Sequence, residues 1–314
     1  LEKVYHFNPI PEELTEEESK YVLGAQGNVW TEYMKSEKQV EYMAFPRAIA
    51  LSEVVWSSPE HKNYSDFINR LEQYQKRLDQ LEVNYANHIY YVKGKLTHLN
   101  DRLTYELNTT SSSFPIYYST DRSFPSQLYS TPITVDTSMH IKAVVLDSKK
   151  TVLGAIFEQE INLHKGVGAT IAIDKEPHPA YNAGGKGALI NGISGNNKRY
   201  GDREWLGFSG EDIEITIEFD KPTNINSIAT RFFNGNGQWI YPPKKVTVYI
   251  NNDIRTYVAG ISSTNDLTAK FAVKFESTTV TSIRLKIPSY GIIPEGKQGA
   301  GHKPWTFIDE IIIK

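Results

Sequence analysis

Residues 213–219 read Ile-Glu-Ile-Thr-Ile-Glu-Phe, and this stretch decides how the C-terminal half of the chain folds. Apolar and polar side chains alternate along it, which is the pattern of a β-strand with one buried face. Residues 246–250 and 282–287 alternate in the same way, and residues 308–313 close the chain with an isoleucine-rich run. Of the 21 glycines, only four precede residue 166, so tight turns are concentrated after it. We therefore expect residues 166–314 to form an antiparallel jelly-roll β-sandwich.

Residues 93–165 show a shorter strand pattern. The strand candidates are residues 115–119, 133–135, 140–146 and 152–161, with Ser/Thr/Asp/Pro-rich stretches between them. Apolar runs of this length, separated by turn residues, are typical of a small antiparallel sandwich. We therefore expect a separate β-sandwich over residues 93–165.

Residues 1–92 show mainly the period of helices. Apolar residues three and four apart predict a helix over residues 64–82, with Tyr64, Phe67, Leu71, Tyr74, Leu78 and Leu81 on one face. Pro46 suits the first turn of another helix that runs to about Trp56. Residues 21–25, Tyr-Val-Leu-Gly-Ala, predict a short buried strand. Such a unit is too small to close a core of its own. The predicted fold class is therefore multidomain and mainly β, with a helical N-terminal part.

Composition excludes several classes of protein. The chain has 314 residues with 34 Lys+Arg against 37 Asp+Glu, a net charge of −3. It therefore lacks the excess of basic residues that is typical of a nucleic-acid-binding protein. No apolar run approaches the length of about 18 residues that a membrane-spanning helix needs. The chain has no cysteine, which excludes disulfide scaffolds, zinc–thiolate sites and cysteine nucleophiles.

Three ordered stretches near the N-terminus carry a family resemblance. Residues 23–33 read Leu-Gly-Ala-Gln-Gly-Asn-Val-Trp-Thr-Glu-Tyr, residues 41–47 read Glu-Tyr-Met-Ala-Phe-Pro-Arg, and residues 51–57 read Leu-Ser-Glu-Val-Val-Trp-Ser. Together they resemble the end of a glycoside hydrolase family 20 catalytic domain, the family of the β-N-acetylhexosaminidases. The resemblance implies that residues 1–92 are the C-terminal end of a (β/α)8 barrel. It also implies that Trp30 lines the sugar pocket and that Glu32 binds hydroxyls of the terminal sugar.

The chemistry of these two side chains agrees with that role. A Trp ring can stack on the apolar face of a pyranose, and a carboxylate accepts hydroxyl hydrogen bonds. A barrel places such groups at the C-terminal ends of its strands. The alternative interpretation is a core Trp and a surface Glu in an ordinary loop.

The catalytic motif of this family does not occur in the sequence. Family 20 enzymes use an adjacent Asp-Glu pair in a His-x-Gly-Gly-Asp-Glu-like motif, in which the Glu is the general acid. The Asp orients the substrate's own acetamido group, whose oxygen attacks the anomeric carbon, an exception to the two-carboxylate rule. The one Asp-Glu dipeptide here, Asp309-Glu310, has no glycines before it, and strand alternation would send its side chains to opposite faces.

The resemblance therefore predicts the C-terminal piece of a larger exo-acting hydrolase, with no catalytic residues of its own. The parent is expected to be exported and to act on glycans with terminal N-acetylhexosamine. Residues 1 to about 60, left without the rest of a barrel to cover their apolar side chains, are expected to be poorly ordered, buried by self-association or refolded against the sandwiches. The helix over residues 64–82 is expected to persist.

Two further resemblances concern the β-rich segments. Residues 115–121 and 141–145 resemble the small sandwich that follows chitobiase catalytic domains. Residues 188–193, 205–208, 213–219, 239–243 and 309–311 resemble the discoidin, or coagulation-factor type C, fold, which includes family 32 carbohydrate-binding modules.

The discoidin resemblance implies two sites. One is a structural Ca²⁺ held by the loop at Asn191, which stands where the family has Asp, and by Glu310; calcium also accepts neutral amide and backbone oxygens. The other is a sugar site on the loops, with Trp239, Trp205, Arg203 and Trp305 as candidates. The alternatives are that Glu310 faces solvent and that the tryptophans cap the sandwich core.

Three functions remain open from the sequence. The chain is a piece of a β-N-acetylhexosaminidase, or a non-catalytic carbohydrate-binding or adhesion protein of two sandwiches, or a hydrolase piece whose sandwiches are only spacers. The Trp30–Glu32 motif favours the first, because a free-standing binding module needs neither this motif nor the strand before it.

Overall fold

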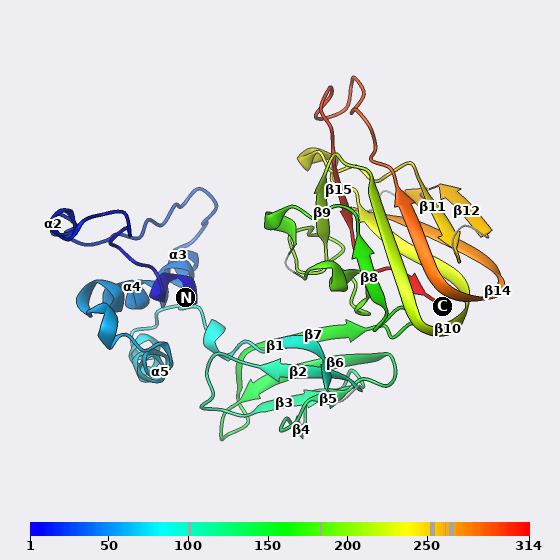
Figure 1. The fold of residues 1–314 in the computed structure, drawn as a ribbon. Coiled ribbons are helices and arrows are strands. Elements are labelled where there is room, and N and C mark those ends of the chain that lie inside the picture. The colour runs from blue at the N-terminus through cyan, green and yellow to red at the C-terminus, as the bar shows by residue number, and fades with distance from the viewer. Residues whose placement is uncertain (100–101, 183, 252–254, 261, 264–266) are drawn as a thin grey trace. The chain divides into compact units, whose positions relative to one another are not determined.

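The computed structural model describes residues 1–99, 102–182, 184–251, 255–260, 262–263 and 267–314. It contains two compact units, and Figure 1 shows the course of the chain through them. The first unit comprises Leu1–Lys95, Glu106–Pro132 and Lys142–Glu158, and the second comprises Leu96–Tyr105, Ile133–Ile141 and Gln159–Lys314. The middle segment contributes residues to both units, so the predicted boundaries after residues 92 and 165 stay predictions.

The N-terminal part of the first unit is helical. Its helices are α1 (Glu2–Tyr5), α2 (Glu16–Ser19), α3 (Glu37–Ala44), α4 (Arg47–Trp56) and α5 (Tyr64–Gln80). The predicted helices are confirmed as α4, which follows Pro46, and α5, whose first turn is capped by the Asn63 side chain. None of the helices in the described ranges is long and apolar enough to cross a membrane.

A small core forms around Tyr5 of α1. The rings of Tyr5 and Phe67 lie 4.8 Å apart, and both side chains are 1% exposed. Ala50 and Val54 of α4 are buried as well. The expectation that this part closes no core is therefore wrong, because α1, which the sequence pattern did not predict, supplies the aromatic side chain that α4 and α5 cover.

The strand predicted over residues 21–25 is absent. This stretch has no regular structure, and Tyr21 and Leu23 are 80% and 96% exposed. An extended segment becomes a strand only when a neighbour takes up its backbone hydrogen bonds. No described residue pairs with residues 21–25 in a ladder, so the apolar run remains a loop.

The middle segment forms two small sheets, as predicted for a β-rich segment. Their strand orders are β1-β2-β5 and β4-β3-β6-β7. The strands are β1 (Lys93–Leu99), β2 (Arg102–Asn108), β3 (Ile116–Ser119), β4 (Gln127–Leu128), β5 (Ile133–Thr134), β6 (Met139–Leu146) and β7 (Val152–Ile161). The predicted strands correspond to β3, β5, β6 and β7, whereas β1, β2 and β4 were not predicted.

The C-terminal segment of the second unit is built on a larger antiparallel sheet. Its main path is β12-β11-β14-β10-β15-β9, with β8 and β16 paired to β10, and β13 to β14. The strands are β8 (Thr170–Ile173), β9 (Leu206–Ser209), β10 (Ile213–Phe233), β11 (Lys245–Ile250), β12 (Arg255–Gly260), β13 (Ser262–Ser263), β14 (Thr268–Ile287), β15 (Trp305–Ile308) and β16 (Ile312–Ile313). The three alternating stretches of the sequence lie in β10, β11 and β14. The mainly β, antiparallel fold is therefore confirmed.

The two longest strands, β10 and β14, run side by side (Figure 1), and both contribute side chains to the core of the C-terminal segment. Ile213, Ile215 and Ile217 are at most 2% exposed and face Ile287, Leu285 and Ile283 of β14 in register. Register shifts follow Glu218 and Ile225. Bulges of this kind bend a strand and increase its twist. They let β10 pair with β8 in its first half and with β15 and β16 in its second half.

The isoleucine-rich C-terminus differs from the single strand that its alternation predicts. β15 ends at Ile308 and β16 begins at Ile312. Asp309 and Glu310 lie in the break between them and are 0% and 1% exposed. The break matters because it turns both carboxylates into the protein, where each finds its own donors.

Hydrogen exchange of the whole chain should separate the loop at 21–33 from the large sheet. We expect the amides of residues 21–33 to exchange fastest among the described segments, because this stretch has no ladder and little cover. The amides of residues 213–219 should exchange slowest. Equal, strong protection of both stretches in the monomer would contradict this assignment.

Candidate functional site

Trp30 and Glu32 lie in the irregular loop between α2 and α3. Trp30 is 71% exposed, and Glu32 is exposed as well. Within the described residues, neither side chain makes a hydrogen bond or an ion pair with the protein. The interpretation as a core Trp is therefore wrong. Both groups are free to contact a ligand, although nothing in this segment fixes their position.

In the C-terminal segment, Trp205 is part of a cluster of aromatic rings. We call Tyr181, Tyr200, Trp205, Phe233, Trp305 and Phe307 the aromatic cluster. The Trp205 ring is 0% exposed, and its Nε1 donates to the Asn196 carbonyl over 3.1 Å. A Cβ on Gly195 would lie 2.3 Å from the same Nε1, so only glycine fits beside it. Trp205 therefore does not fit the sugar-contacting role predicted for it, and it packs the core instead.

Trp239 and Trp305 lie closer to solvent and are linked to each other. The Trp305 backbone N–H donates to the Trp239 carbonyl over 2.8 Å. Trp239 is 39% exposed and stacks on His302 at a centroid distance of 4.7 Å. Trp305 is half-buried and has His178 at 5.2 Å, edge to face. Arg203, the remaining candidate, is exposed on the loop before β9.

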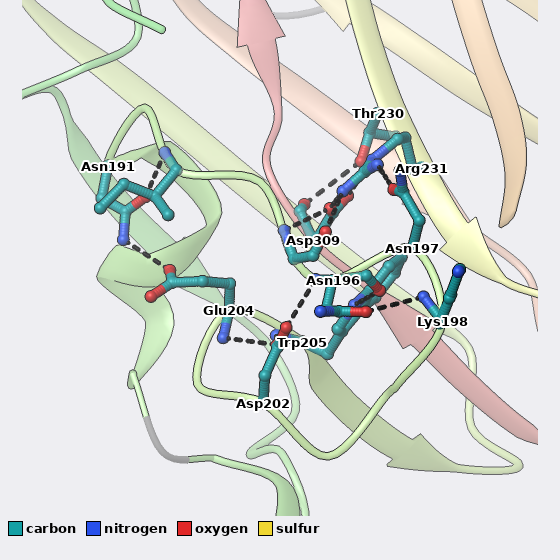
Figure 2. Close-up of polar contacts among 12 residues, drawn as sticks. Asn191, Asn196, Asn197, Lys198, Asp202, Glu204, Trp205, Thr230, Arg231 and Asp309 are labelled. Carbon is teal, nitrogen blue, oxygen red and sulfur yellow. Dashed lines mark hydrogen bonds and ion pairs between the residues drawn. The ribbon is translucent and has the colours of Figure 1, made fainter. Parts of the chain in front are cut away.

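A network of polar contacts around Trp205 holds the loop of residues 195–205, as Figure 2 shows. The Asp309 carboxylate accepts from the Gly195 N–H at 2.9 Å and from the Arg231 guanidinium. Arg231 also donates to the Gly195 carbonyl and to Asn197 Oδ1. Its guanidinium carbon lies 5.5 Å from the centroid of the Trp205 ring. The loop is therefore tied to β10 through Arg231 and to the break after β15 through Asp309.

Asp202 organises the other end of this loop. Its Oδ2 accepts from the Asn196 N–H at 2.5 Å, and its Oδ1 accepts from the Glu204 N–H at 3.1 Å (Figure 2). Glu204 in turn accepts a hydrogen bond from the Asn191 side-chain amide at 2.8 Å. These contacts make a loop whose backbone is fixed before any ligand arrives.

Burial weakens the acidity of the three carboxyl groups in this region. Burial raises the pKa of Asp309 to about 7 against the opposing effect of the Arg231 guanidinium. Burial also raises the pKa of Glu204 to about 7, opposed by the hydrogen bond from Asn191. The pKa of Glu310 is raised by burial too, against the hydrogen bond from His164. Each carboxylate therefore depends on its hydrogen-bond donors to stay ionised.

Asn191 and Glu310 do not fit the calcium site that the discoidin resemblance implies. Asn191 Oδ1 accepts from the Ile193 N–H at 2.7 Å, so it is turned into its own loop. Glu310 Oε1 accepts from His164 Nε2 at 2.5 Å and from the Gly192 N–H at 2.9 Å. The second carboxylate oxygen of Glu310, Oε2, is buried without a hydrogen bond among the described residues. The described residues hold no cluster of three or more His, Asp or Glu side chains suited to a metal, and calcium needs six to eight oxygens.

The structure thus brings some predicted residues together and separates others. Trp239 and Trp305 share one backbone contact, and Trp205 lies in the aromatic cluster that includes Trp305. Asn191 lies next to Gly192, whose N–H donates to Glu310 Oε1. The roles of Arg231, Asp202 and Asp309 in fixing the loop were not predicted. No local pattern marks them, because they meet only in the folded sheet.

Two family models match parts of the chain. Residues 1–59 match the glycosyl hydrolase family 20 catalytic domain, and residues 98–158 match the chitobiase/β-hexosaminidase C-terminal domain. The first match includes Trp30 and Glu32. The second covers much of the two small sheets of the middle segment.

Two curated relatives from different bacteria match parts of the chain. The chain is 36% identical over 140 residues to a β-hexosaminidase of Porphyromonas gingivalis, covering 43% of this chain and 18% of that protein. It is 32% identical over 60 residues to a β-N-acetylhexosaminidase of Cellulomonas fimi, covering 19% of this chain and 12% of that protein. The matches thus span less than a fifth of either relative.

Among solved structures, a Streptococcus pneumoniae fucose-binding module is similar over 48% of this chain and 94% of its own, with 11% identity and a TM-score of 0.33. The fucose binding is a property of that module, and a similarity this low does not extend it to the present chain. The two family models and the curated relatives agree on where the similarity lies: residues 1–59 are similar to a glycosyl hydrolase family 20 catalytic domain, and residues 98–158 are similar to a chitobiase/β-hexosaminidase C-terminal domain.

Proposed function

We propose that this chain is the C-terminal part of an exo-acting β-N-acetylhexosaminidase that removes terminal N-acetylhexosamine from glycans. In this proposal the parent works by substrate-assisted, retaining hydrolysis and is exported to its substrates. The chain contributes Trp30 and Glu32 to the sugar pocket and carries accessory β-domains. The observation that carries the proposal is the ordered match of a family 20 catalytic segment followed by a chitobiase C-terminal domain.

The chemistry assigned to the loop between α2 and α3 is binding and orientation. The exposed Trp30 ring would stack on the apolar face of the terminal sugar. The Glu32 carboxylate, free of protein partners within the described residues, would accept hydrogen bonds from the sugar hydroxyls. Protonation of the leaving group and orientation of the acetamido group require the Asp-Glu pair, which the 314 residues do not contain in a suitable motif.

The 314-residue chain alone should therefore not hydrolyse an aryl N-acetylglucosaminide. Glu32 has no second carboxylate in the motif that could deliver the proton and orient the acetamide. An assay that measures release of the aryl group by the purified chain checks this. Turnover that is abolished by Glu32→Gln would contradict the assignment of catalysis to residues outside this chain.

In the full-length enzyme, Glu32→Gln and Trp30→Ala should each lower kcat/KM by roughly ten- to a hundredfold. The loss of a buried hydrogen bond between a sugar and a charged group typically costs about 1.5–3 kcal/mol. The melting temperature should change little, because both side chains are exposed in the chain and support no core.

The chain offers matched controls for both changes. Trp56 is 88% exposed at the end of α4, and Glu12 is exposed before α2. Trp56→Ala and Glu12→Gln should leave kcat/KM at the wild-type value. If the Trp30 and Glu32 variants behave like these controls, the loop has no part in substrate binding.

We further propose that the loops around Trp239 and Trp305 bind a glycan, which is also the basis of the alternative function as a non-catalytic binding protein. Two linked tryptophans near the surface support this. The loop of residues 195–205, which Arg231 and Asp309 fix, supports it as well, because its Tyr200 belongs to the aromatic cluster that includes Trp305. The preorganised loop would lower the ordering cost of binding.

Titration of N-acetylglucosamine oligomers into the chain tests glycan binding. Trp239→Ala and Trp305→Ala should each weaken binding several-fold at an unchanged melting temperature, whereas Trp205→Ala should lower the melting temperature because its ring is buried. Wild-type binding in the first two variants would exclude this surface, and no binding by the wild-type chain would leave the sandwich as a spacer.

A further inference from the structure

We infer that His164 takes the place of a structural cation at Glu310, so that the C-terminal sandwich is closed there by a buried histidine–carboxylate hydrogen bond and without a metal. The side chains of His164 and Glu310 are 0% and 1% exposed. His164 Nε2 lies 2.5 Å from Glu310 Oε1. This inference is independent of the proposed function.

The backbone around His164 fixes which nitrogen carries the proton. The Gly166 N–H donates to Nδ1 over 3.1 Å, and the Ile313 N–H approaches the same atom at 3.4 Å. An Nδ1 that accepts cannot carry a proton, so the hydrogen of the neutral imidazole is on Nε2. His164 is therefore a directed donor to Glu310.

The same carboxylate oxygen joins three separate stretches of the chain. Glu310 Oε1 accepts from His164 and from the Gly192 N–H at 2.9 Å. Backbone hydrogen bonds from Asn162 to Gly192 and from Lys165 to Ile313 run alongside. The segment that enters the sandwich, the loop at Asn191 and the C-terminus are thus held at one point.

The donors around Glu310 are the opposite of what a calcium ion needs. A calcium ion is surrounded by acceptor oxygens, whereas two N–H groups converge on Oε1 and the Asn191 oxygen is directed at the Ile193 N–H. The hydrogen bonds of His164 and Gly192 occupy the positions from which a cation would contact Oε1, and the other carboxylate oxygen, Oε2, is buried without a hydrogen bond among the described residues. We therefore identify His164 as the positioning residue for this corner of the sandwich.

Thermal unfolding of the full chain tests the inference. The melting temperature should be the same, to within about 1 °C, in millimolar calcium and in excess chelator, since an ion that does not bind the folded state cannot stabilise it. His164→Phe should lower the melting temperature by roughly 4–8 °C, because Glu310 loses a buried donor. Calcium should not restore it. His302→Phe, at an exposed ring, is the matched control and should have little effect.

A stabilisation of the wild-type chain by calcium of several degrees would overturn the inference, as would a His164→Phe variant that melts like His302→Phe. If His164→Phe does not fold, nitrogen NMR of the wild-type imidazole decides the question. A proton on Nε2 with an unprotonated Nδ1 supports the directed donor. A proton on Nδ1 overturns it.

Discussion

The antiparallel pairing of β10 with β14 runs from Ile213 opposite Ile287 to Phe233 opposite Thr268. This register places the isoleucines of residues 213–217 on the buried face. A slip by one residue would move them all to solvent, so the hydrophobic effect holds the register in place. The two register shifts after Glu218 and Ile225 then bend the pair, and the bend lets one strand carry partners at both of its ends.

The loops of the C-terminal segment depend on that register. Arg231 lies near the end of β10, and its backbone carbonyl accepts from the Asp309 N–H, while its guanidinium meets the Asp309 carboxylate. Asp309 in turn holds Gly195, and Gly195 leaves the space that the Trp205 ring fills. A change in the pairing of β10 would therefore reach the loop of residues 195–205 through Arg231, both by its own hydrogen bonds to the loop and by its ion pair with Asp309.

The strands with clean alternation could be predicted from the sequence, and those that depend on partners far along the chain could not. Residues 213–219 alternate strictly and form part of β10, because one buried face suffices to specify such a strand. Residues 21–25 are as apolar as a buried strand, yet they stay a loop without a ladder partner. Strand β1 was missed because Leu96 and Leu99 are its only apolar residues of any size and do not alternate. Strand β2 was missed although Leu103, Tyr105 and Leu107 alternate with polar residues, so its pattern does predict a strand.

The candidate sites show the same limit at the level of single residues. Asp309 and Glu310 were expected on opposite faces of one strand, and the break between β15 and β16 instead buries both. Sequence spacing cannot show that the donors for one are Arg231 and Gly195, and for the other His164 and Gly192. Those donors lie 78 to 146 positions away along the chain, and only the fold brings them together.

The tryptophans give the clearest reason why residue type alone does not assign a function. Trp205 is 0% exposed, Trp239 is 39% exposed and Trp30 is 71% exposed. Trp205 is covered because contacts with Arg231 of β10 and with Asp309 hold its loop against the sheet. Trp30 is uncovered, and the apolar stretch before it, residues 21–25, pairs with no described strand. A ring can bind a sugar only where its own domain has left it uncovered. The same apolar surface can therefore serve only one purpose at a time. At Trp205 it is buried and stabilises the fold, and at Trp30 it is exposed and available to a ligand.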